Sequence, residues 1–336
     1  MSKKYKNGLV LGKFLPPHLG HFFLIDTALE NSETVHVLVC SLIRELIPGK
    51  LRYEWIKEHY SKNPNVRVIH VARELPQYPE EDPENFWQIW HDVVYSKVKE
   101  LDCIFASEDY VKPFADVLGI NSYMVDRGRI KVPISGTAIR ENPLKHWDFI
   151  PDVAKPYFTK RIAILGPESS GKSTLTKMLA KHYGVEYVEE YGRLVYEFRK
   201  GELDEEAFTH IAEGRQVLED YKLKSGNKLL ICDTEDITTY LFSRMFLPAT
   251  YKNIEKILLN KINDTRKYDL YMLLAPDCAA VQDGTRKFLN LRWQHFHEIQ
   301  KLLEKYSLPY KVISGNWSDR YTSSIKTIDS TFKFTR

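Results

Sequence analysis

The sequence is poor in cysteine, and its four cysteines form no metal-binding or redox pattern, since no two of them stand in C-x-x-C spacing. This argues against a disulfide framework or a zinc site and favours small buried side chains in a reducing compartment. Long apolar runs are missing too. None approaches the ~20 residues of a membrane span, and the charged N-terminus is unlike a signal peptide. We therefore expect a cytoplasmic protein with no membrane segment.

The chain also has almost no excess of charge of one sign. Its 48 Lys and Arg side chains stand against 45 Asp and Glu, a net charge of +3. So small an excess is no signature of nucleic-acid binding, although local basic clusters can still hold polyphosphates. The hydrophobic content of 43% and the charged content of 28% are typical of globular proteins. The length of 336 residues predicts two domains, each able to bury its own core.

Short apolar runs alternate with helical patterns in both halves of the chain. The expected strands are 8–14, 35–40, 66–71, 103–106 and 122–125 in the first half, and 161–165, 185–188, 228–232, 270–274 and 310–313 in the second. This alternation predicts an α/β fold of two doubly wound parallel sheets, with ligands at the carboxyl ends of the strands. An irregular segment at 141–159 holds three prolines and separates the halves, so we expect domains at 1–157 and 158–336.

The segment GPESSGKST at 166–174 follows an apolar run and precedes a helical pattern, as a phosphate-binding loop requires. Its two glycines let backbone N–H groups turn toward phosphate oxygens at a helix N-terminus. Lys172 can reach the β and γ phosphates of ATP, and the Ser173 hydroxyl can ligate Mg²⁺. We expect this loop to bind ATP through Gly166, Glu168, Ser169, Ser170, Gly171, Lys172, Ser173 and Thr174.

Asp233 follows the buried strand expected at 228–232 and occupies the position of a Walker B carboxylate. It can hold Mg²⁺ together with Ser173, or it can accept the proton of an attacking hydroxyl. A plain helix N-cap is the structural alternative, and it is compatible with either role. We therefore expect Lys172 and Asp233 to be the catalytic residues of this half.

Other polar side chains stand where a kinase needs to bind the phosphate acceptor and to close a lid over the transferred phosphate. Glu190, Tyr191 and Arg193 come at the end of the strand after the phosphate-loop helix, which favours a nucleoside or nucleotide kinase. A GTPase is disfavoured because no N-K-x-D guanine motif is present. Further on, Arg286 and Arg292 belong to a basic stretch that can close over the transferred phosphate. An exposed charged loop is the alternative.

Two histidines mark the start of the first helical pattern. His18 and His21 lie three apart after a turn rich in glycine and proline. They can bind a metal, but no third ligand at a suitable spacing is evident. They can instead grip phosphate oxygens with the help of the helix N-terminus. In a second segment, ISGTAIR at 134–140, Ser135 is a natural N-cap and Arg140 can reach the same anion. An ordinary capped surface helix is the alternative.

Together, GKFLPPHLGH at 12–21 and ISGTAIR at 134–140 resemble the nucleotidylyltransferase superfamily, and within it the nicotinamide mononucleotide adenylyltransferases. The resemblance implies that the 5′-phosphate of a mononucleotide attacks the α-phosphorus of ATP and that pyrophosphate leaves. It also implies that His18, His21 and Arg140 hold the ATP phosphates and are the catalytic residues. The ATP contacts implied for this half are Gly12, Lys13, Phe14, His18, His21, Ser135, Thr137 and Arg140.

The segment NFWQIW at 85–90 offers an aromatic surface. A nicotinamide ring is flat and cationic, so the face of Trp87 or Trp90 can stack on it. Alternatively, both tryptophans, three apart, form one apolar helix face in the core. We expect at least one of them at the ligand. The expected contacts of nicotinamide mononucleotide are Lys13, Trp87, Trp90 and Asp126, two of which follow strand ends.

The whole chain resembles the bifunctional NadR family, which joins a Rossmann-like adenylyltransferase to a P-loop ribosylnicotinamide kinase. The phosphate loop, EYGR at 190–193 and DGTR at 283–286 carry the resemblance in the second half. It implies that the kinase half makes nicotinamide mononucleotide from the riboside and that the first half makes NAD. ATP is the co-substrate and Mg²⁺ the cofactor of both. The riboside contacts implied are Glu190, Tyr191, Arg193, Asp233 and Asp283, and Arg286 and Arg292 join the ATP site.

Two departures from the family matter. Only about six residues precede the first strand, so the helix-turn-helix domain of some members is missing and we expect no DNA binding. The family also tends to have an aromatic residue shortly before the Asp-Gly element, whereas this chain has none at 277–282, where Ala280 stands. Stacking of the riboside would then fall to another residue, such as Tyr191. In an alternative reading, the kinase half senses nucleotide or NAD and only the adenylyltransferase turns over. The preference for amide or acid substrates and the formation of a homo-oligomer stay open.

Overall fold

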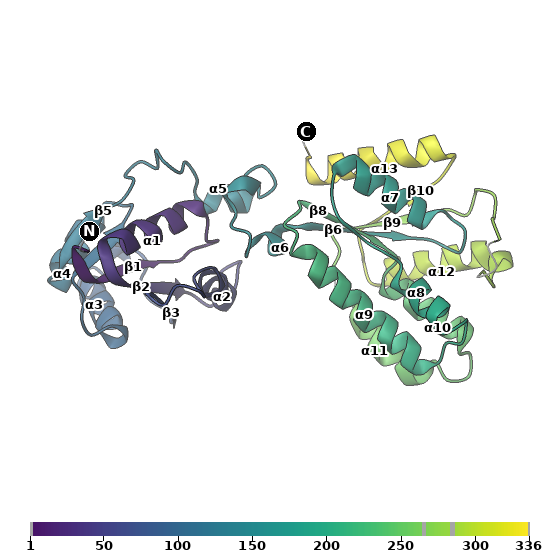
Figure 1. The fold of residues 1–336 in the computed structure, drawn as a ribbon, viewed down its shortest axis with the longest axis horizontal. Helices are drawn as coiled ribbons and strands as arrows, with labels where there is room; N and C mark the ends of the chain where they lie inside the picture. Colours follow the sequence, from purple (N-terminus) through teal and green to yellow (C-terminus); the bar gives the residue numbers. More distant parts are fainter. Residues whose placement is uncertain (1–2, 264–266, 283–285, 335–336) are drawn as a thin grey trace. The chain divides into compact units, whose positions relative to one another are not determined.

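The computed structural model describes residues 3–263, 267–282 and 286–334 and divides the chain into two compact units, 1–155 and 156–336 (Figure 1). This division lies two residues before the boundary expected from the sequence. Each unit is a parallel five-stranded sheet covered by helices, so the predicted α/β fold is confirmed. Among the described helices, none has the length and apolar character needed to cross a membrane.

In unit 1 the strand order is β3-β2-β1-β4-β5, which places β1 at the centre of a doubly wound sheet. Its strands are β1 (Tyr5–Gly12), β2 (Ser32–Ser41), β3 (Val66–Ala72), β4 (Cys103–Ala106) and β5 (Asn121–Met124). Its helices are α1 (Leu19–Asn31), α2 (Gly49–His59), α3 (Phe86–Lys97), α4 (Val111–Leu118) and α5 (Gly136–Glu141), with short 3-10 turns at Pro79–Glu81 and Trp147–Phe149.

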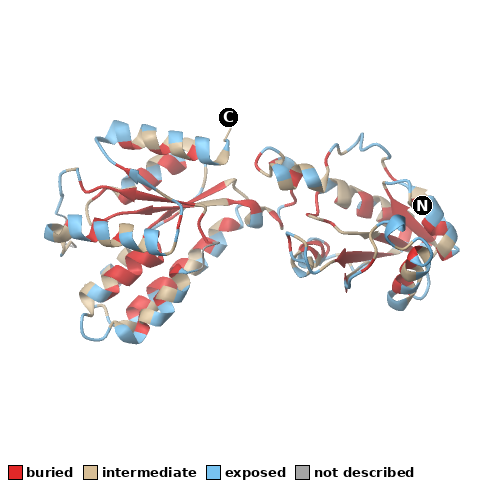
Figure 2. Cartoon of the chain, turned by 180° about the vertical axis from the view of Figure 1, so that it is seen from behind, coloured by how far each residue is buried: buried red, intermediate tan, exposed pale blue. Residues whose placement is uncertain are grey.

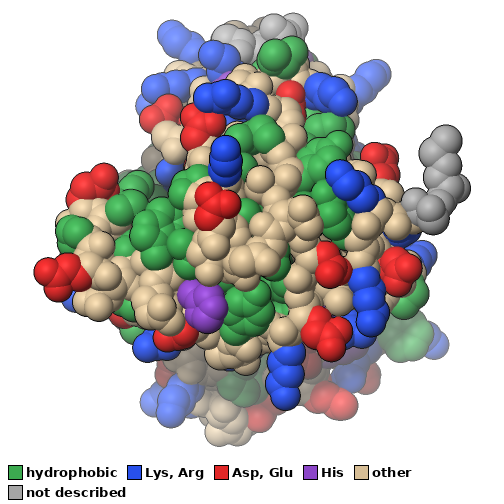
Figure 3. All heavy atoms as spheres, turned by 90° about the vertical axis from the view of Figure 1, so that its left-hand side faces the viewer, with side chains coloured by type: hydrophobic (Ala, Val, Ile, Leu, Met, Phe, Trp, Pro, Cys, Tyr) green, Lys and Arg blue, Asp and Glu red, His purple; other side chains and the backbone are tan. Residues whose placement is uncertain are grey.

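The core of unit 1 has a layer on each face of the sheet. The run from Val35 to Cys40 is buried throughout, because a central parallel strand is covered on both sides. Its side chains alternate between a cluster shared with α1 and α2 and a cluster shared with α3 and α4. Figure 2 shows this pattern as red strands between helices that are red only on their inner faces. Viewed from one end, the surface of this unit carries acidic and basic side chains intermingled (Figure 3).

In unit 2 the order is β10-β9-β6-β8-β7, so the strand that leads into the phosphate loop is central. The strands are β6 (Lys160–Leu165), β7 (Tyr187–Val188), β8 (Leu229–Asp233), β9 (Leu270–Leu274) and β10 (Tyr310–Ile313). The helices are α6 (Lys155–Phe158), α7 (Lys172–Tyr183), α8 (Tyr191–Phe198), α9 (Glu205–Leu223), α10 (Asp236–Phe246), α11 (Lys252–Ile262), α12 (Arg292–Lys305) and α13 (Trp317–Phe332), with a 3-10 turn at Leu289–Leu291.

The helices of unit 2 divide between the two faces of its sheet. α7 and α13 cover one face, and α8 to α12 cover the other (Figure 1). A buried ion network ties the second layer together. Arg215 of α9 pairs with Glu219 and with Asp236 of α10, and Lys267 reaches Asp236 at 2.8 Å. Because each buried charge has a partner of opposite sign, the network holds α9, α10 and the start of β9 in register.

Candidate phosphate-binding sites of the two units

The phosphate loop of unit 2 is shaped by two glycines at which any side chain would be strained. Gly166 has φ +150°, and a Cβ there would lie 2.9 Å from the Leu274 carbonyl oxygen. Gly171 has φ +88°, and a Cβ there would lie 2.3 Å from the Trp317 ring. The loop therefore curls as predicted and opens into α7 at Lys172. Lys172 is 8% exposed, and its ammonium group donates to the Pro167 carbonyl at 3.1 Å, so the group lies inside the loop.

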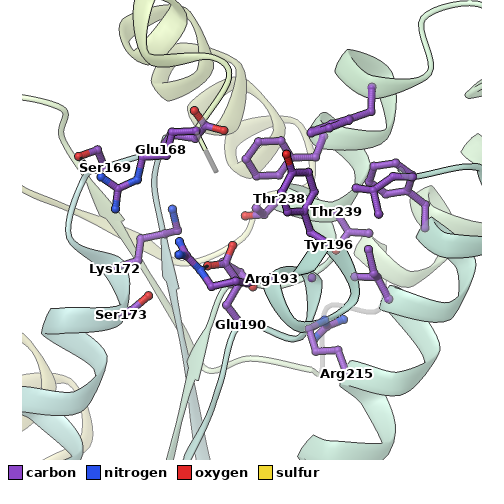
Figure 4. Close-up of a pocket in the computed structure, with 18 of the residues that line it drawn as sticks. Glu168, Ser169, Lys172, Ser173, Glu190, Arg193, Tyr196, Arg215, Thr238 and Thr239 are labelled. Carbon is purple, nitrogen blue, oxygen red and sulfur yellow. Dashed lines mark hydrogen bonds and ion pairs between the residues drawn. The ribbon is translucent and has the colours of Figure 1, made fainter. Parts of the chain in front are cut away.

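A pocket opens from the phosphate loop toward α8, α9 and α10. Its empty volume is about 1090 Å³, counted out to its open mouth. Figure 4 shows Lys172, Arg193 and Glu190 converging at the loop, with Tyr196, Thr238 and Thr239 on the opposite side. The loop contributes Glu168, Ser169, Gly171, Lys172, Ser173 and Thr174 to the wall. Ser170 instead is fully buried behind the loop, with its hydroxyl unpartnered.

Two carboxylates stand at the junction of loop and pocket. Burial and the neighbouring Glu190 raise the pKa of Asp233 to about 6, against the pull of Lys172 and of the hydrogen bond from the Ser173 hydroxyl. Glu190 is held by Arg193, whose Nε lies 3.3 Å from a carboxylate oxygen. The predicted residues Lys172, Ser173, Asp233, Glu190 and Arg193 are thus brought together by the fold.

The Asp233 side chain fits the role of a cation ligand. One carboxylate oxygen, Oδ1, is buried without a hydrogen-bond partner, and the other side of the group meets Ser173. No cluster of three or more His, Cys, Asp or Glu side chains suited to a metal occurs in the described part of the chain. A cation at this point would therefore share Ser173 and Asp233 with the phosphates of a nucleotide, as Mg²⁺ does in nucleotide sites.

The two arginines after β9 occupy different positions. Arg286 lines the pocket and donates to the Ser169 hydroxyl at 3.0 Å. Arg292 is buried and donates to the carbonyl oxygens of Glu168, Ser169 and Cys278 at 3.0–3.2 Å. Arg292 therefore holds the backbone of the phosphate loop. Asp283, expected at the riboside, lies outside the described residues.

The side of the pocket away from the phosphate loop contains residues that the sequence analysis missed. Tyr196 of α8, Phe208 of α9, and Phe242 and Phe246 of α10 form an apolar compartment. Their rings contact one another, with centroids 6.1–6.3 Å apart for three pairs. The i, i+4 spacing of Phe242 and Phe246, on the helix after the Walker B strand, is a signal that could have shown it. Tyr191 lies outside this pocket, because its hydroxyl pairs with His210 and its ring packs on Gly214.

In unit 1 the strand-to-helix turn after β1 presents the histidine pair. The His18 N–H donates to Nδ1 of His21 at 3.3 Å, so the proton of a neutral His21 ring is on Nε2. The two rings stack with centroids 3.7 Å apart, and Phe14 packs edge-on against His21. Burial, with the nearby charge of Arg129, lowers the pKa of His18 to about 4. Burial and His18 lower the pKa of His21 well below its usual value, so both rings are neutral near pH 7.

The second motif of unit 1 lies beside this turn. A Cβ on Gly136 would stand 2.4 Å from the Leu15 carbonyl oxygen, so α5 begins in direct contact with the turn. Arg140 donates to the same oxygen and, at 3.0 Å, to the Thr137 hydroxyl. The Ser135 hydroxyl caps α5 by accepting from the Ala138 N–H at 3.2 Å, as predicted. The fold thus joins segments about 115 residues apart in the sequence.

A buried arginine that the sequence analysis missed holds the backbone just after the end of β1. Arg52 of α2 is fully buried and donates to the carbonyl oxygens of Lys13 and Ile47 while pairing with Glu45. The Lys13 ammonium lies 3.8 Å from Glu45 and stays partly exposed. Gly12 and Lys13 therefore keep a defined backbone path into the turn.

The residues expected at the mononucleotide have differing surroundings. Trp90 is only 8% exposed and donates its indole N–H to the Pro76 carbonyl at 3.0 Å, so it belongs to the core. Trp87 is half-buried and packs on Phe86 and Phe114. Asp126 accepts the backbone N–H groups of residues 130–132, which lower the pKa of its carboxyl group. Its carboxylate therefore shapes the loop after β5.

Fold and sites define a nucleotide-binding α/β protein with a P-loop in unit 2 and a candidate phosphate site in unit 1. Residues 161–320 match a protein-family model described as an AAA domain. The chain is 32% identical over 304 residues to the trifunctional NAD biosynthesis/regulator protein NadR of Escherichia coli K12, covering 83% of this chain and 71% of that one. The NadR protein of Salmonella typhimurium LT2 is 31% identical over 308 residues, covering 84% and 72%.

The chain belongs to the NadR family. The resemblance found in the motifs is confirmed, and so, at the level of the family, is the expectation of an enzyme of NAD biosynthesis. Two crystal structures of NadR, one in complex with NR and one with NAD and AMP-PNP, superpose with a TM-score of 0.84. They cover 100% of this chain and 98–99% of theirs at 22% identity, which extends the likeness of fold to both units.

Proposed function

We propose that the protein catalyses two consecutive steps of NAD salvage in the cytoplasm. Unit 2 transfers the γ-phosphate of ATP to the 5′-hydroxyl of nicotinamide riboside. Unit 1 joins the resulting nicotinamide mononucleotide to the AMP part of ATP, which yields NAD and pyrophosphate. The observation that carries the proposal is the unit 2 pocket, where the phosphate loop and Glu190 meet an aromatic compartment and Asp233 lies beside Glu190. The NR and NAD bound in the related NadR structures support it.

In unit 2 the pocket suits an acceptor with a flat, cationic ring. The aromatic compartment of Tyr196, Phe242 and Phe246 attracts such a ring through its π faces. The ribose then lies toward Glu190 and Arg193. The 5′-oxygen attacks the γ-phosphorus, its proton passes to the Glu190 carboxylate, and ADP leaves. Lys172 and the loop N–H groups stabilise the charge that develops on the phosphoryl oxygens.

Mg²⁺ held by Ser173 and Asp233 would neutralise charge on the β and γ phosphates of ATP. A carboxyl group with a pKa of about 6 is ionised at physiological pH and is available as a ligand. The grouping of Lys172, Ser173 and Asp233 supports phosphoryl transfer over a purely nucleotide-sensing role for unit 2.

In unit 1 the turn after β1 binds the ATP phosphates. The N-terminus of α1, the neutral rings of His18 and His21, and Arg140 supply hydrogen-bond donors at one place. A phosphate oxygen of nicotinamide mononucleotide attacks the α-phosphorus, and pyrophosphate carries the released charge toward Arg140. No side chain needs to form a covalent bond, so positioning and charge stabilisation account for catalysis. Trp87 and Lys13 are the proposed contacts of the mononucleotide.

The test offers the purified protein nicotinamide riboside, nicotinamide mononucleotide or nicotinic acid mononucleotide with Mg²⁺-ATP and separates the products. Lys172→Ala should abolish riboside phosphorylation and spare adenylyl transfer, and His18→Ala should do the reverse. Lys177→Ala, one turn along α7 and exposed, and His91→Ala on the surface of α3 are matched controls that should change neither. Loss of both activities in a folded Lys172→Ala or His18→Ala variant would refute the assignment of one reaction to each unit.

A further inference from the structure

Trp317 is an exposed tryptophan set directly against the phosphate loop. It is the first residue of α13, immediately after the loop that leaves β10, and it is 44% exposed. The ring lies so close to Gly171 that a Cβ there would approach it to 2.3 Å. Residues 314–316 and 318–319 around it are exposed as well. What sets this tryptophan apart is its position, since a ring partly open to water lies directly against a phosphate loop.

Arg320 holds Trp317 in place. The Arg320 side chain is 1% exposed, and its guanidinium group donates to the carbonyl oxygens of Ser170, Ala275 and Gly315 at 2.7–2.8 Å. It therefore joins the phosphate loop, the end of β9 and the β10–α13 loop into one corner. Its central carbon lies 6.0 Å from the Trp317 ring centroid. The ring is thus fixed relative to the phosphate loop, while a large part of its surface stays free.

Trp317 is separate from the acceptor pocket. That pocket opens from the phosphate loop toward α8, α9 and α10, and Trp317 is not among its lining residues. α13 covers the opposite face of the sheet together with α7. A nucleotide bound with its terminal phosphates in the loop must place its base somewhere outside the loop. The base must also lie outside the acceptor pocket, so that the acceptor can bind there.

We propose that Trp317 is the stacking platform for the base of the phosphate donor in unit 2. The flat indole beside Gly171 would pack against the adenine ring while the loop holds the phosphates. Stacking on an aromatic side chain suits any base, because every base has a π face. The proposal rests on the proposed role of the phosphate loop in binding ATP, and it does not depend on which acceptor is phosphorylated.

The experiment compares Trp317→Ala, Trp317→Phe and Trp293→Ala in the full chain. Trp293 is the matched control, since it is 53% exposed but packs on Phe296 and His297 of α12. The measured quantities are the KM for ATP in riboside phosphorylation and the inhibition constants of ADP and of inorganic tripolyphosphate, which has no base. Trp317→Ala should raise the values for ATP and ADP about tenfold and leave that for tripolyphosphate unchanged. Trp317→Phe should keep most of the affinity, and Trp293→Ala should match the wild type.

An equal loss of affinity for tripolyphosphate and for ADP in Trp317→Ala would overturn the proposal, because Trp317 would then only support the loop. Unchanged ADP affinity in Trp317→Ala would overturn it too. A second readout, the change in tryptophan fluorescence when ADP binds, needs no acceptor. Lys172→Ala should remove the part of this change that comes from ADP in the phosphate loop. The same part should vanish in Trp317→Phe. A wild type that shows this signal but does not phosphorylate nicotinamide riboside would contradict the proposed function and leave the platform standing.

Discussion

Asp233→Asn should make unit 2 more stable while it abolishes phosphorylation. Burial and Glu190 raise the pKa of this carboxyl group from 3.8 to about 6. A shift of about 2 units corresponds to about 3 kcal/mol, by which the ionised side chain destabilises the folded state near neutral pH. Asn has the same shape without the charge, and at 3% exposure the site has little solvent screening. Allowing for a weaker contact with Ser173, we expect a gain of about 1–3 kcal/mol at pH 8.

The sign of the pH dependence follows from the raised pKa. Below pH 3.8 the carboxyl group is protonated in both the folded and the unfolded chain, so it contributes no penalty. The penalty grows as the pH rises from about 4 to about 6, where only the unfolded chain is ionised, and is complete above the folded pKa. The stabilisation by Asp233→Asn should therefore be largest above pH 7 and small near pH 4.

The assay is urea denaturation at pH 4.5 and at pH 8 with a chelator present. The measured quantity is the free energy of unfolding obtained from the transition of unit 2. Asp236→Asn is the matched control, three residues further on and equally buried. Burial disfavours its charge, but Arg215 and Lys267 keep the pKa of Asp236 low, so removing the charge should destabilise unit 2 by about 3–5 kcal/mol. The reasoning fails if Asp233→Asn destabilises the protein at pH 8, or if its effect is the same at both pH values.

Three further predictions concern the two sites. Glu190→Gln should lower the pKa of Asp233, so the midpoint of Mg²⁺-dependent ADP binding, measured by calorimetry, should move below pH 6; an unmoved midpoint would contradict the coupling. Because burial lowers the pKa of His18 to about 4, adenylyl transfer should show no loss with a midpoint near 6.5 when its rate is measured from pH 8 down to 5.5. Gly136→Ala should push α5 away from the Leu15 carbonyl and slow adenylyl transfer about 10- to 100-fold. Riboside phosphorylation is its internal control, and an unaffected adenylyl rate would show that the close contact is dispensable.

Local patterns predicted most of the fold and singled out the segments of both candidate phosphate sites. All ten expected strands are present, although β7 is reduced to two residues and β1 begins three residues earlier than expected. The phosphate loop and the histidine turn were readable because each is a short segment whose glycines, caps and charged side chains act on neighbouring backbone groups. By contrast α11 was missed, although its buried Ile254, Leu258 and Ile262 recur at the i, i+4 spacing of a helix.

Residues whose role depends on what their side chains contact could not be assigned from the sequence. Trp87 and Trp90 looked alike, yet only Trp90 is buried with its indole N–H bonded to Pro76. Asp126 follows a strand end as a ligand would, but its carboxylate binds the backbone of its own loop. Tyr191 was expected to replace a missing aromatic residue, and it instead faces His210 on the outer side of α8.

The sequence by itself determined that the chain has two doubly wound units, a P-loop in the second and a histidine turn in the first, because periodicity and short motifs act over one or two turns of chain. The tertiary structure decided which side chains share a site. It set Gly136 and Arg140 against Leu15, gathered aromatic rings from three helices into one pocket beside the phosphate loop, and laid Trp317 on Gly171. Such contacts depend on how helices pack across a sheet, and residues more than a hundred positions apart meet only when that packing is complete.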